Sequence, residues 1–219
     1  MKANVPRSPD PSKRRRPLQS RSKETSRALQ EAFVQLLVER DYARVTIREI
    51  VMVAGTGLGS FYQYFASKDE LARTCIHLRT KALLQSLRDA INGNGGRPLP
   101  DIVDAMLESQ LAAVRERPRE WGVHFLLERH LSGPEAYRKM YGQFIDEWVH
   151  AFDASTGLPP DFPKQEAAQV SQAILYELVA ATHIRTDGKP DLGVLERQCR
   201  DALHAYLART ALQGDAGKT

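Results

Sequence analysis

The segment 46–65 constrains the fold of this chain most, because it places strong helix and turn signals within twenty residues. Thr46 precedes Glu49 by three positions, the spacing of a capping box, and predicts a helix that begins directly after the threonine. Isoleucine and valine recur at helical spacing until Ala54, and the run Ala54-Gly55-Thr56-Gly57 is expected to form a turn. The segment is therefore expected to open with a short helix and a turn.

A second short helix is predicted after the turn. Leu58, Phe61 and Phe65 recur at the spacing of one helical face, so we expect them to point inward. A longer helix before the segment has an apolar face formed by Leu29, Ala32, Phe33, Leu36 and Leu37. Two short helices around a glycine-bearing turn, behind a longer supporting helix, predict a helix-turn-helix domain at residues 21–67.

Positive charge is concentrated in the first third of the chain. Residues 1–75 hold 14 Lys and Arg against 8 Asp and Glu, a net charge of +6, whereas the remaining residues hold 17 against 19, a net charge of −2. Such a distribution is expected if the first third meets a polyanion. Residues 1–20 are rich in proline and basic residues, and helical periodicity starts only near Ser22 or Thr25, so we predict a flexible basic arm. The arm either stays in solution or lies along DNA phosphates or a minor groove.

The rest of the chain predicts helices alone. Ser67 is expected to cap a fourth helix, which the glycine-rich run after residue 91 ends. The apolar stripe of that helix is predicted to contain Leu71, Cys75, Leu78 and Ala82 and to run on toward Leu87 and Ile91. Five further helices are expected at roughly 101–117, 119–131, 134–155, 164–186 and 191–210. No alternating strand pattern and no internal repeat is visible, so the predicted fold is all-α with about nine helices.

Several classes of function are disfavoured. Two widely separated cysteines give no disulfide framework, and no apolar run suits a signal peptide or a membrane span, so we expect a cytoplasmic protein. The glycine run at 93–96 follows a helix rather than a strand, and the serines lack convincing His and Asp partners, so no catalytic residues are predicted. His124 and Glu128 could chelate a metal only with a third ligand. We therefore expect no enzyme, no metal and no cofactor.

The segment 46–71 carries a set of motifs at fixed spacing. They are the threonine that opens the second helix, Ala54-Gly55, and Phe61-Tyr62-x-Tyr64-Phe65-x-Ser67-Lys68-x-x-Leu71. This combination resembles the DNA-binding domain of the TetR family of repressors, and the likeness extends to chain length and helix number. The C-terminal two-thirds match in architecture alone. Thr56, Gly57 and Gly59 depart from the family pattern, so no operator sequence can be carried over from a relative.

The resemblance implies that the last short helix enters the major groove of double-stranded DNA. The residues predicted to contact DNA are Thr46, Arg48, Leu58, Ser60, Tyr62, Gln63, Tyr64 and Lys68. The hydroxyls and Lys68 suit phosphates, Gln63 suits a base edge such as adenine, and Leu58 suits a thymine methyl group. Phe61 and Phe65 are expected to stay in the core.

The resemblance also implies a homodimer on a palindromic operator, with recognition helices about 34–36 Å apart. Residues 68–212 would form a helical effector-binding and dimerisation domain, followed by a flexible tail at 213–219. The predicted interface comes from the last two helices and comprises Val170, Ile174, Leu178, Leu195, Cys199, Ala202 and Tyr206. Alternatively, these apolar stripes pack only within one subunit.

The middle helices combine apolar stripes with a few polar side chains, as small-molecule sites do. The residues predicted to line an effector pocket are Met106, Gln110, Trp121, His124, Phe125, Glu128, Tyr141, Phe144, Trp148, Tyr176 and His183. The effector would be partly apolar or aromatic. The alternative is that these aromatic stripes are plain core.

The sequence thus predicts a DNA-binding transcriptional regulator, most simply a repressor that a small-molecule effector releases from its operator. Shifting such an equilibrium from 1:99 to 99:1 requires about 5.5 kcal/mol of differential affinity. Two alternatives remain: a DNA-bound protein-interaction module without an effector, and an activator of the same fold. A cavity lined by Gln110, Trp121 and Tyr141 would favour the effector-responsive repressor, and a solid core would favour the interaction module.

Overall fold

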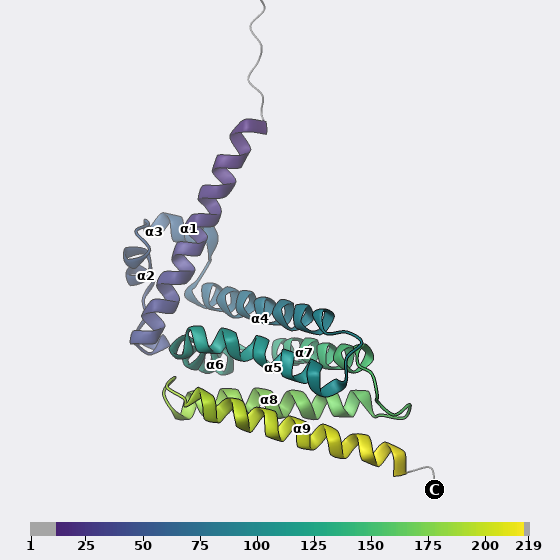
Figure 1. Ribbon diagram of the computed structural model, residues 1–219. Helices are drawn as coiled ribbons and strands as arrows, with labels where there is room; N and C mark the ends of the chain where they lie inside the picture. Colours follow the sequence, from purple (N-terminus) through teal and green to yellow (C-terminus); the bar gives the residue numbers. More distant parts are fainter. Residues whose placement is uncertain (1–11, 217–219) are drawn as a thin grey trace, which may run out of the picture. The chain divides into compact units, whose positions relative to one another are not determined.

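The structure is a computed structural model that describes residues 12–216, and within this range it contains helices and no strand (Figure 1). The elements in order are α1 (Ser12–Glu39), the 3-10 helix η1 (Tyr42–Arg44), α2 (Ile47–Val53), α3 (Leu58–Tyr64), α4 (Lys68–Gly93), α5 (Leu99–Glu116), α6 (Pro118–Leu131), α7 (Pro134–Ala154), α8 (Lys164–Arg185) and α9 (Leu192–Ala216). The all-α prediction is therefore confirmed. No helix in the described range is long and apolar enough to span a membrane.

The chain divides into two compact units within α4. Unit 1 ends at Leu71 and unit 2 begins at Ala72. The boundary lies close to the one predicted at residues 67 and 68, and the first turn of α4 therefore belongs to the smaller unit.

Unit 1 is the predicted helix-turn-helix, with α2 and α3 packed against α1. The hydroxyl of Thr46 accepts a hydrogen bond from the Glu49 backbone nitrogen at 3.3 Å, and the Glu49 carboxylate accepts one from the Thr46 nitrogen at 2.9 Å. This completes the capping box and fixes where α2 begins. Gly55 has a φ of +64°, so the turn between α2 and α3 uses backbone freedom that other residues rarely have.

The helices at both ends of the described range are longer than predicted. α1 begins at Ser12 rather than near Ser22 or Thr25, so residues 12–20 of the predicted arm are helical. Lysine and arginine have good helix propensity but no apolar periodicity, which is why the hydrophobic pattern missed them. At the other end, α9 continues to Ala216 instead of ending at residue 210. Residues 1–11 and 217–219 lie outside the described residues.

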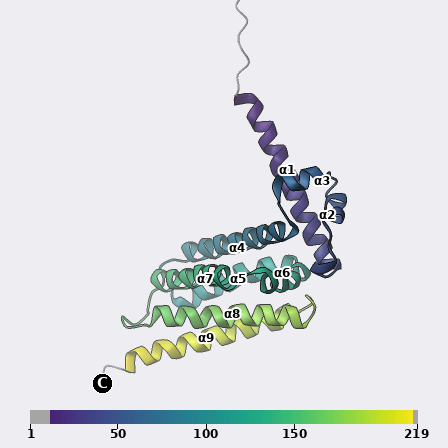
Figure 2. The ribbon, with the colours of Figure 1, turned by 180° about the vertical axis from the view of Figure 1, so that it is seen from behind.

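Unit 2 consists of packed helices in layers. In both views, α5, α6 and α7 lie between α4 and the pair formed by α8 and α9 (Figures 1 and 2). The stripe predicted for α4 is partly wrong, because Leu78 and Ala82 are exposed. The buried face contains Ile76 and Thr80 in their place, and the predicted Leu87 and Ile91 are buried as expected. The predicted and the observed stripe both have helical spacing, but only the observed one packs against the core of unit 2.

Two glycines allow α6 to approach the loop between α8 and α9 closely. A Cβ atom added to Gly188 would lie 2.9 Å from the Cα of Arg119, and one added to Gly122 would lie 3.1 Å from the Cα of Gly188. Gly188 also has a φ of +67°. The backbone of the first turns of α6 therefore lies directly against the backbone of this loop. The same helix carries Trp121, whose side chain lines a cavity in unit 2.

Candidate functional site

The third helix of unit 1 has one buried face and one exposed face. Phe61 is completely buried and its ring lies 5.8 Å from that of Phe65, which confirms that both belong to the core. Tyr62 is 55% exposed, and Gln63 is also exposed. Leu58, the first residue of α3, is 43% exposed, so the expectation that it points inward with Phe61 and Phe65 is wrong. A short helix with hydrogen-bonding and apolar side chains directed outward has the shape and chemistry to contact base edges and phosphates in a major groove.

Other predicted contact residues surround this exposed face. Ser60 and Tyr64 on α3 are half-buried, whereas Arg48 on α2 is exposed. The hydroxyl of Thr46 is engaged in the capping box and also donates to the Glu49 carboxylate at 2.8 Å. Thr46 therefore acts first as a helix cap, and the backbone that it fixes sets the position of Arg48.

Lys68 has a structural role that the sequence did not predict. Its Nζ donates hydrogen bonds to the carbonyl oxygens of Tyr42 and Val45, each at 2.8 Å, and lies 4.2 Å from the centre of the Tyr42 ring. Two of the three ammonium protons are thereby used. The prediction of a phosphate contact is revised accordingly: Lys68 joins the start of α4 to η1 and to the residue after it.

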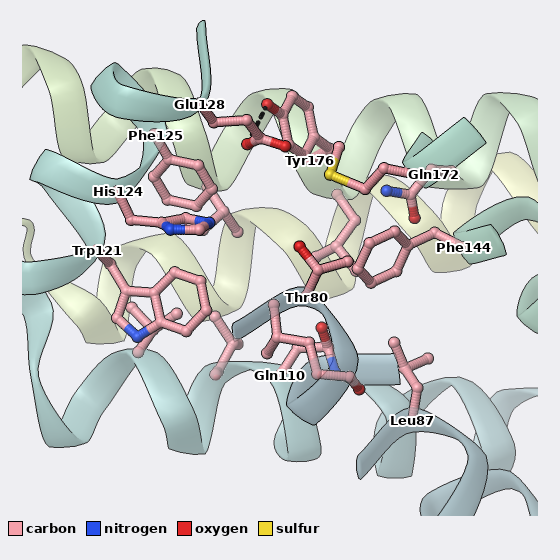
Figure 3. Close-up of a pocket in the computed structure, with 16 residues that line it drawn as sticks. Thr80, Leu87, Gln110, Trp121, His124, Phe125, Glu128, Phe144, Gln172 and Tyr176 are labelled. Carbon is pink, nitrogen blue, oxygen red and sulfur yellow. Dashed lines mark hydrogen bonds between the residues drawn. The ribbon is translucent and has the colours of Figure 1, made fainter. Parts of the chain in front are cut away.

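Unit 2 contains a cavity of about 70 Å³ with mainly apolar walls. It is lined by Thr80, Leu83, Leu87, Gln110, Leu111, Val114, Trp121, His124, Phe125, Glu128, Met140, Phe144, Gln172, Leu175, Tyr176 and Val179. In Figure 3, the carboxyl group of Glu128 and the hydroxyl of Tyr176 lie at one end, with Gln110 and Leu87 at the other. The cavity has room for a few water molecules and is smaller than typical pockets for drug-sized ligands, about 300–1,000 Å³.

Seven of the eleven residues predicted for the pocket line this cavity. The four that do not are Met106, Tyr141, Trp148 and His183. Met106, Trp148 and His183 are buried in the surrounding core, and Tyr141 stacks on Tyr137 at a ring distance of 5.5 Å. Helical periodicity identifies inward faces, but it does not distinguish side chains that fill the core from those that border a void.

Part of the wall that α4 contributes was not predicted from the sequence. Thr80 and Leu83 line the cavity but lie outside the apolar stripe that was expected on this helix. Gln172 on α8 was missed as well, and its side-chain oxygen accepts a hydrogen bond from the Trp148 indole at 3.2 Å. The one available signal was a second apolar stripe on α4, which passes through Leu83.

The polar groups of the cavity are almost all neutral or satisfied. Burial lowers the pKa of His124 to about 3, so its imidazole is uncharged near neutral pH. Gln110 donates to the carbonyl oxygen of Leu83 at 3.2 Å. Glu128 accepts a hydrogen bond from the Tyr176 hydroxyl at 3.0 Å, and burial raises the pKa of its carboxyl group. Among the described residues, no group of three metal-ligating side chains gathers here or elsewhere.

Trp121 separates this cavity from an open surface groove of about 320 Å³. The Arg79 guanidinium lies over the Trp121 ring, 4.7 Å from its centre, and donates to the Glu120 carboxylate at 2.8 Å. Leu83 and Trp121 therefore border both spaces, and the Trp121 indole donates a hydrogen bond to the carbonyl oxygen of Ala113 at 2.9 Å.

Five of the seven residues predicted for a dimer interface are exposed or half-buried in the single chain. Val170 is exposed on α8, while Ile174 and Leu178 on the same side are half-buried. On α9, Ala202 and Tyr206 are also half-buried.

The other two interface predictions, Leu195 and Cys199, are wrong. Both side chains are completely buried within the unit 2 core. Their spacing correctly indicated a buried stripe, but periodicity does not show whether the covering surface belongs to the same subunit or to another.

Comparisons with known proteins agree with this geometry. Residues 30–75 match the sequence model of the bacterial regulatory proteins of the tetR family. The uncharacterized HTH-type transcriptional regulator YxbF of Bacillus subtilis strain 168 is 25% identical over 178 residues, which cover 71% of this chain and 46% of YxbF. The chain thus spans about half the length of that curated relative.

Solved structures show the same fold. A protein of Pseudomonas aeruginosa PAO1 described as a transcriptional regulator is 19% identical, with a TM-score of 0.66 over 85% of this chain and 90% of its own. The TetR-like transcriptional regulator LfrR of Mycobacterium smegmatis, in complex with proflavine, is 20% identical, with a TM-score of 0.51 over 84% of this chain and 95% of its own.

Proposed function

We propose that this chain, whose residues 30–75 match the model of the tetR family of bacterial regulatory proteins, is a repressor that binds operator DNA and releases it when a small molecule occupies unit 2. The observation that carries this proposal is the division of α3 into a buried Phe61 face and an exposed Tyr62 face. The family is one of transcriptional regulators rather than enzymes. A DNA-binding role would place the protein in the cytoplasm of a bacterial cell.

In this proposal, α3 is the recognition helix. Gln63 reads a base edge and Leu58 contacts a thymine methyl group, while Tyr62 binds a phosphate. Arg48 adds positive charge from α2. Lys68 has one ammonium proton left after its two carbonyl contacts and contributes less than a free lysine would.

Replacing Tyr62 with alanine is expected to weaken DNA binding by about a hundredfold or more, because a hydrogen bond to a charged group contributes about 1.5–3 kcal/mol and a dimer would lose two. The DNA would be a sequence selected from a random pool by the full chain, and fluorescence anisotropy would give the affinity. The thermal stability of unit 1 should hardly change, since this side chain is exposed.

Leu126→Ala provides a matched control, because Leu126 is 53% exposed but lies on α6 in unit 2. It should leave the affinity for DNA unchanged. A Tyr62→Ala protein that binds the selected DNA as tightly as the parent chain would remove α3 from the proposed interface.

The cavity supports an effector-responsive regulator over a protein-interaction module, for which a solid core was expected. It is lined by Gln110 and Trp121, although not by Tyr141. A ligand larger than a few atoms would have to move Trp121 and Leu83 to gain the volume of the outer groove. That displacement gives the ligand-bound state a structure different from that of the empty protein, as a population shift requires. LfrR, which has this fold, has been crystallised with proflavine.

We place the dimer interface on the solvent side of α8 and α9. Val170, Ile174 and Leu178 form an apolar stripe that unit 2 leaves exposed or half-covered. Ala202 and Tyr206 extend it on α9. Pairing through both helices would bury this stripe and present two copies of α3 to a palindromic operator.

A further inference from the structure

Glu128 has an unsatisfied oxygen in the unit 2 cavity. The residue is 2% exposed, and only one of its carboxyl oxygens has a hydrogen-bond partner, the Tyr176 hydroxyl at 3.0 Å. The other, Oε1, is buried without one. Figure 3 shows the carboxyl group facing the space between Phe125 and Tyr176. A buried acceptor without a donor costs free energy, which a ligand that supplies the missing partner would recover.

No positive side chain is available inside the cavity to serve as that partner. Among the described residues that line it there is no lysine or arginine. His124 is neutral, because burial lowers its pKa to about 3. Arg129 follows Glu128 in the chain, but its guanidinium pairs with Glu177 at 3.2 Å, and both of these side chains are largely exposed. The Glu128 carboxylate can therefore neutralise a bound cation, whereas no described side chain that lines the cavity can neutralise an anion.

The aromatic side chains that line the cavity also favour a positively charged ligand. The indole of Trp121 and the rings of Phe125, Phe144 and Tyr176 all border the space. Aromatic faces attract organic cations, and more strongly when water is excluded. A cation would also oppose the effect of burial, which raises the pKa of the Glu128 carboxyl group, by stabilising the carboxylate.

We propose that the ligand of this cavity is a small organic cation, an aromatic or alkyl ammonium, whose charged group pairs with the Glu128 carboxylate and whose apolar part packs against Trp121 and Phe144. The inference rests on the proposed ligand-responsive function and names the class of its effector. The apolar part would extend toward Leu83 and the outer groove, which gives the site selectivity for charge at one end and tolerance of length at the other.

Two molecules of nearly the same shape test the charge preference. Benzylammonium carries a positive charge and three N–H donors where ethylbenzene has a neutral methyl group, and benzenesulfonate provides an anion of similar size. Both tryptophans of the chain lie in unit 2, and Trp121 lines the cavity, so tryptophan fluorescence of the full chain reports binding directly. We expect the cation to bind at least tenfold more tightly than the neutral molecule and the anion to bind least.

Glu128→Gln keeps the shape of the side chain and an acceptor for Tyr176, and it should remove the preference for benzylammonium over ethylbenzene. Glu177→Gln is the matched control, because it removes the same charge from an exposed position next to Arg129 and should preserve the preference. Equal binding of the two molecules to the parent chain would overturn the inference. So would a preference that survives Glu128→Gln, or no binding of the cation at all.

The same titrations separate this inference from the proposed function. Adding the cation to the complex with selected DNA measures release. If the cation binds with the expected preference but the protein stays on DNA, the charge assignment stands and the effector role of the cavity is wrong. If the neutral molecule binds equally and releases the DNA, the effector role stands and the charge assignment is wrong.

Discussion

Replacing Phe61 with alanine is expected to destabilise unit 1 by about 3–5 kcal/mol and to abolish DNA binding, because the change leaves a cavity where the largest buried side chain of α3 had been. The Phe61 ring contacts that of Phe65 and holds α3 to the rest of the unit. Unit 1 is small, and small domains have little stability to lose. A change of this size would leave it mostly unfolded.

Circular dichroism would follow the loss of helix in unit 1, while tryptophan fluorescence would show unit 2 melting as in the parent chain, because both tryptophans lie there. Leu58→Ala is the control on the same helix, at an exposed position, and should change stability by no more than about 0.5 kcal/mol. A Phe61→Ala chain with unchanged helix content and melting would contradict the packing described for α3.

Gly188→Ala is expected to destabilise unit 2 by about 2–5 kcal/mol. A left-handed backbone costs about 1–2 kcal/mol for a residue with a Cβ atom, and overpacking typically adds about 1–3 kcal/mol. The new Cβ would lie 2.9 Å from the Cα of Arg119, where backbone rather than a flexible side chain must move. Because α6 would shift with Arg119, the cavity behind Trp121 should change as well.

Gly157→Ala isolates the effect of the close approach. Gly157 has a φ of +82°, but a Cβ atom added there would have nothing within 4 Å, so its substitution should cost about 1–2 kcal/mol from the backbone conformation alone. Chemical denaturation followed by tryptophan fluorescence compares the two variants. Equal losses of stability at both positions would show that the contact between α6 and the α8–α9 loop is not tight.

Local signals made unit 1 predictable. The capping box of Thr46 and Glu49, the glycine turn, and the inward spacing of Phe61 and Phe65 all act between residues that are close in the sequence. Each element could therefore be located before its packing was known. The fourth helix was also placed correctly, because Ser67 caps its first turn with a hydrogen bond from the Glu70 nitrogen at 3.1 Å.

The features that the sequence did not predict depend on contacts between residues that are far apart in the chain. Lys68 binds the carbonyl oxygens of Tyr42 and Val45, and nothing near it in the sequence indicates such partners. Cys199 has the spacing of an interface residue, yet its own subunit covers it. The cavity depends on which of two possible faces α4 turns inward, and Thr80 lies on the face that the apolar pattern did not favour.

The central claim is that this chain binds DNA through α3 as a two-fold dimer, and hydroxyl-radical footprinting tests it most directly. The full chain would be bound to a DNA sequence selected from a random pool. We predict two symmetric protected half-sites about 10–10.5 base pairs apart, both weakened by Tyr62→Ala. A single asymmetric protected stretch, unchanged by Tyr62→Ala, would contradict the claim.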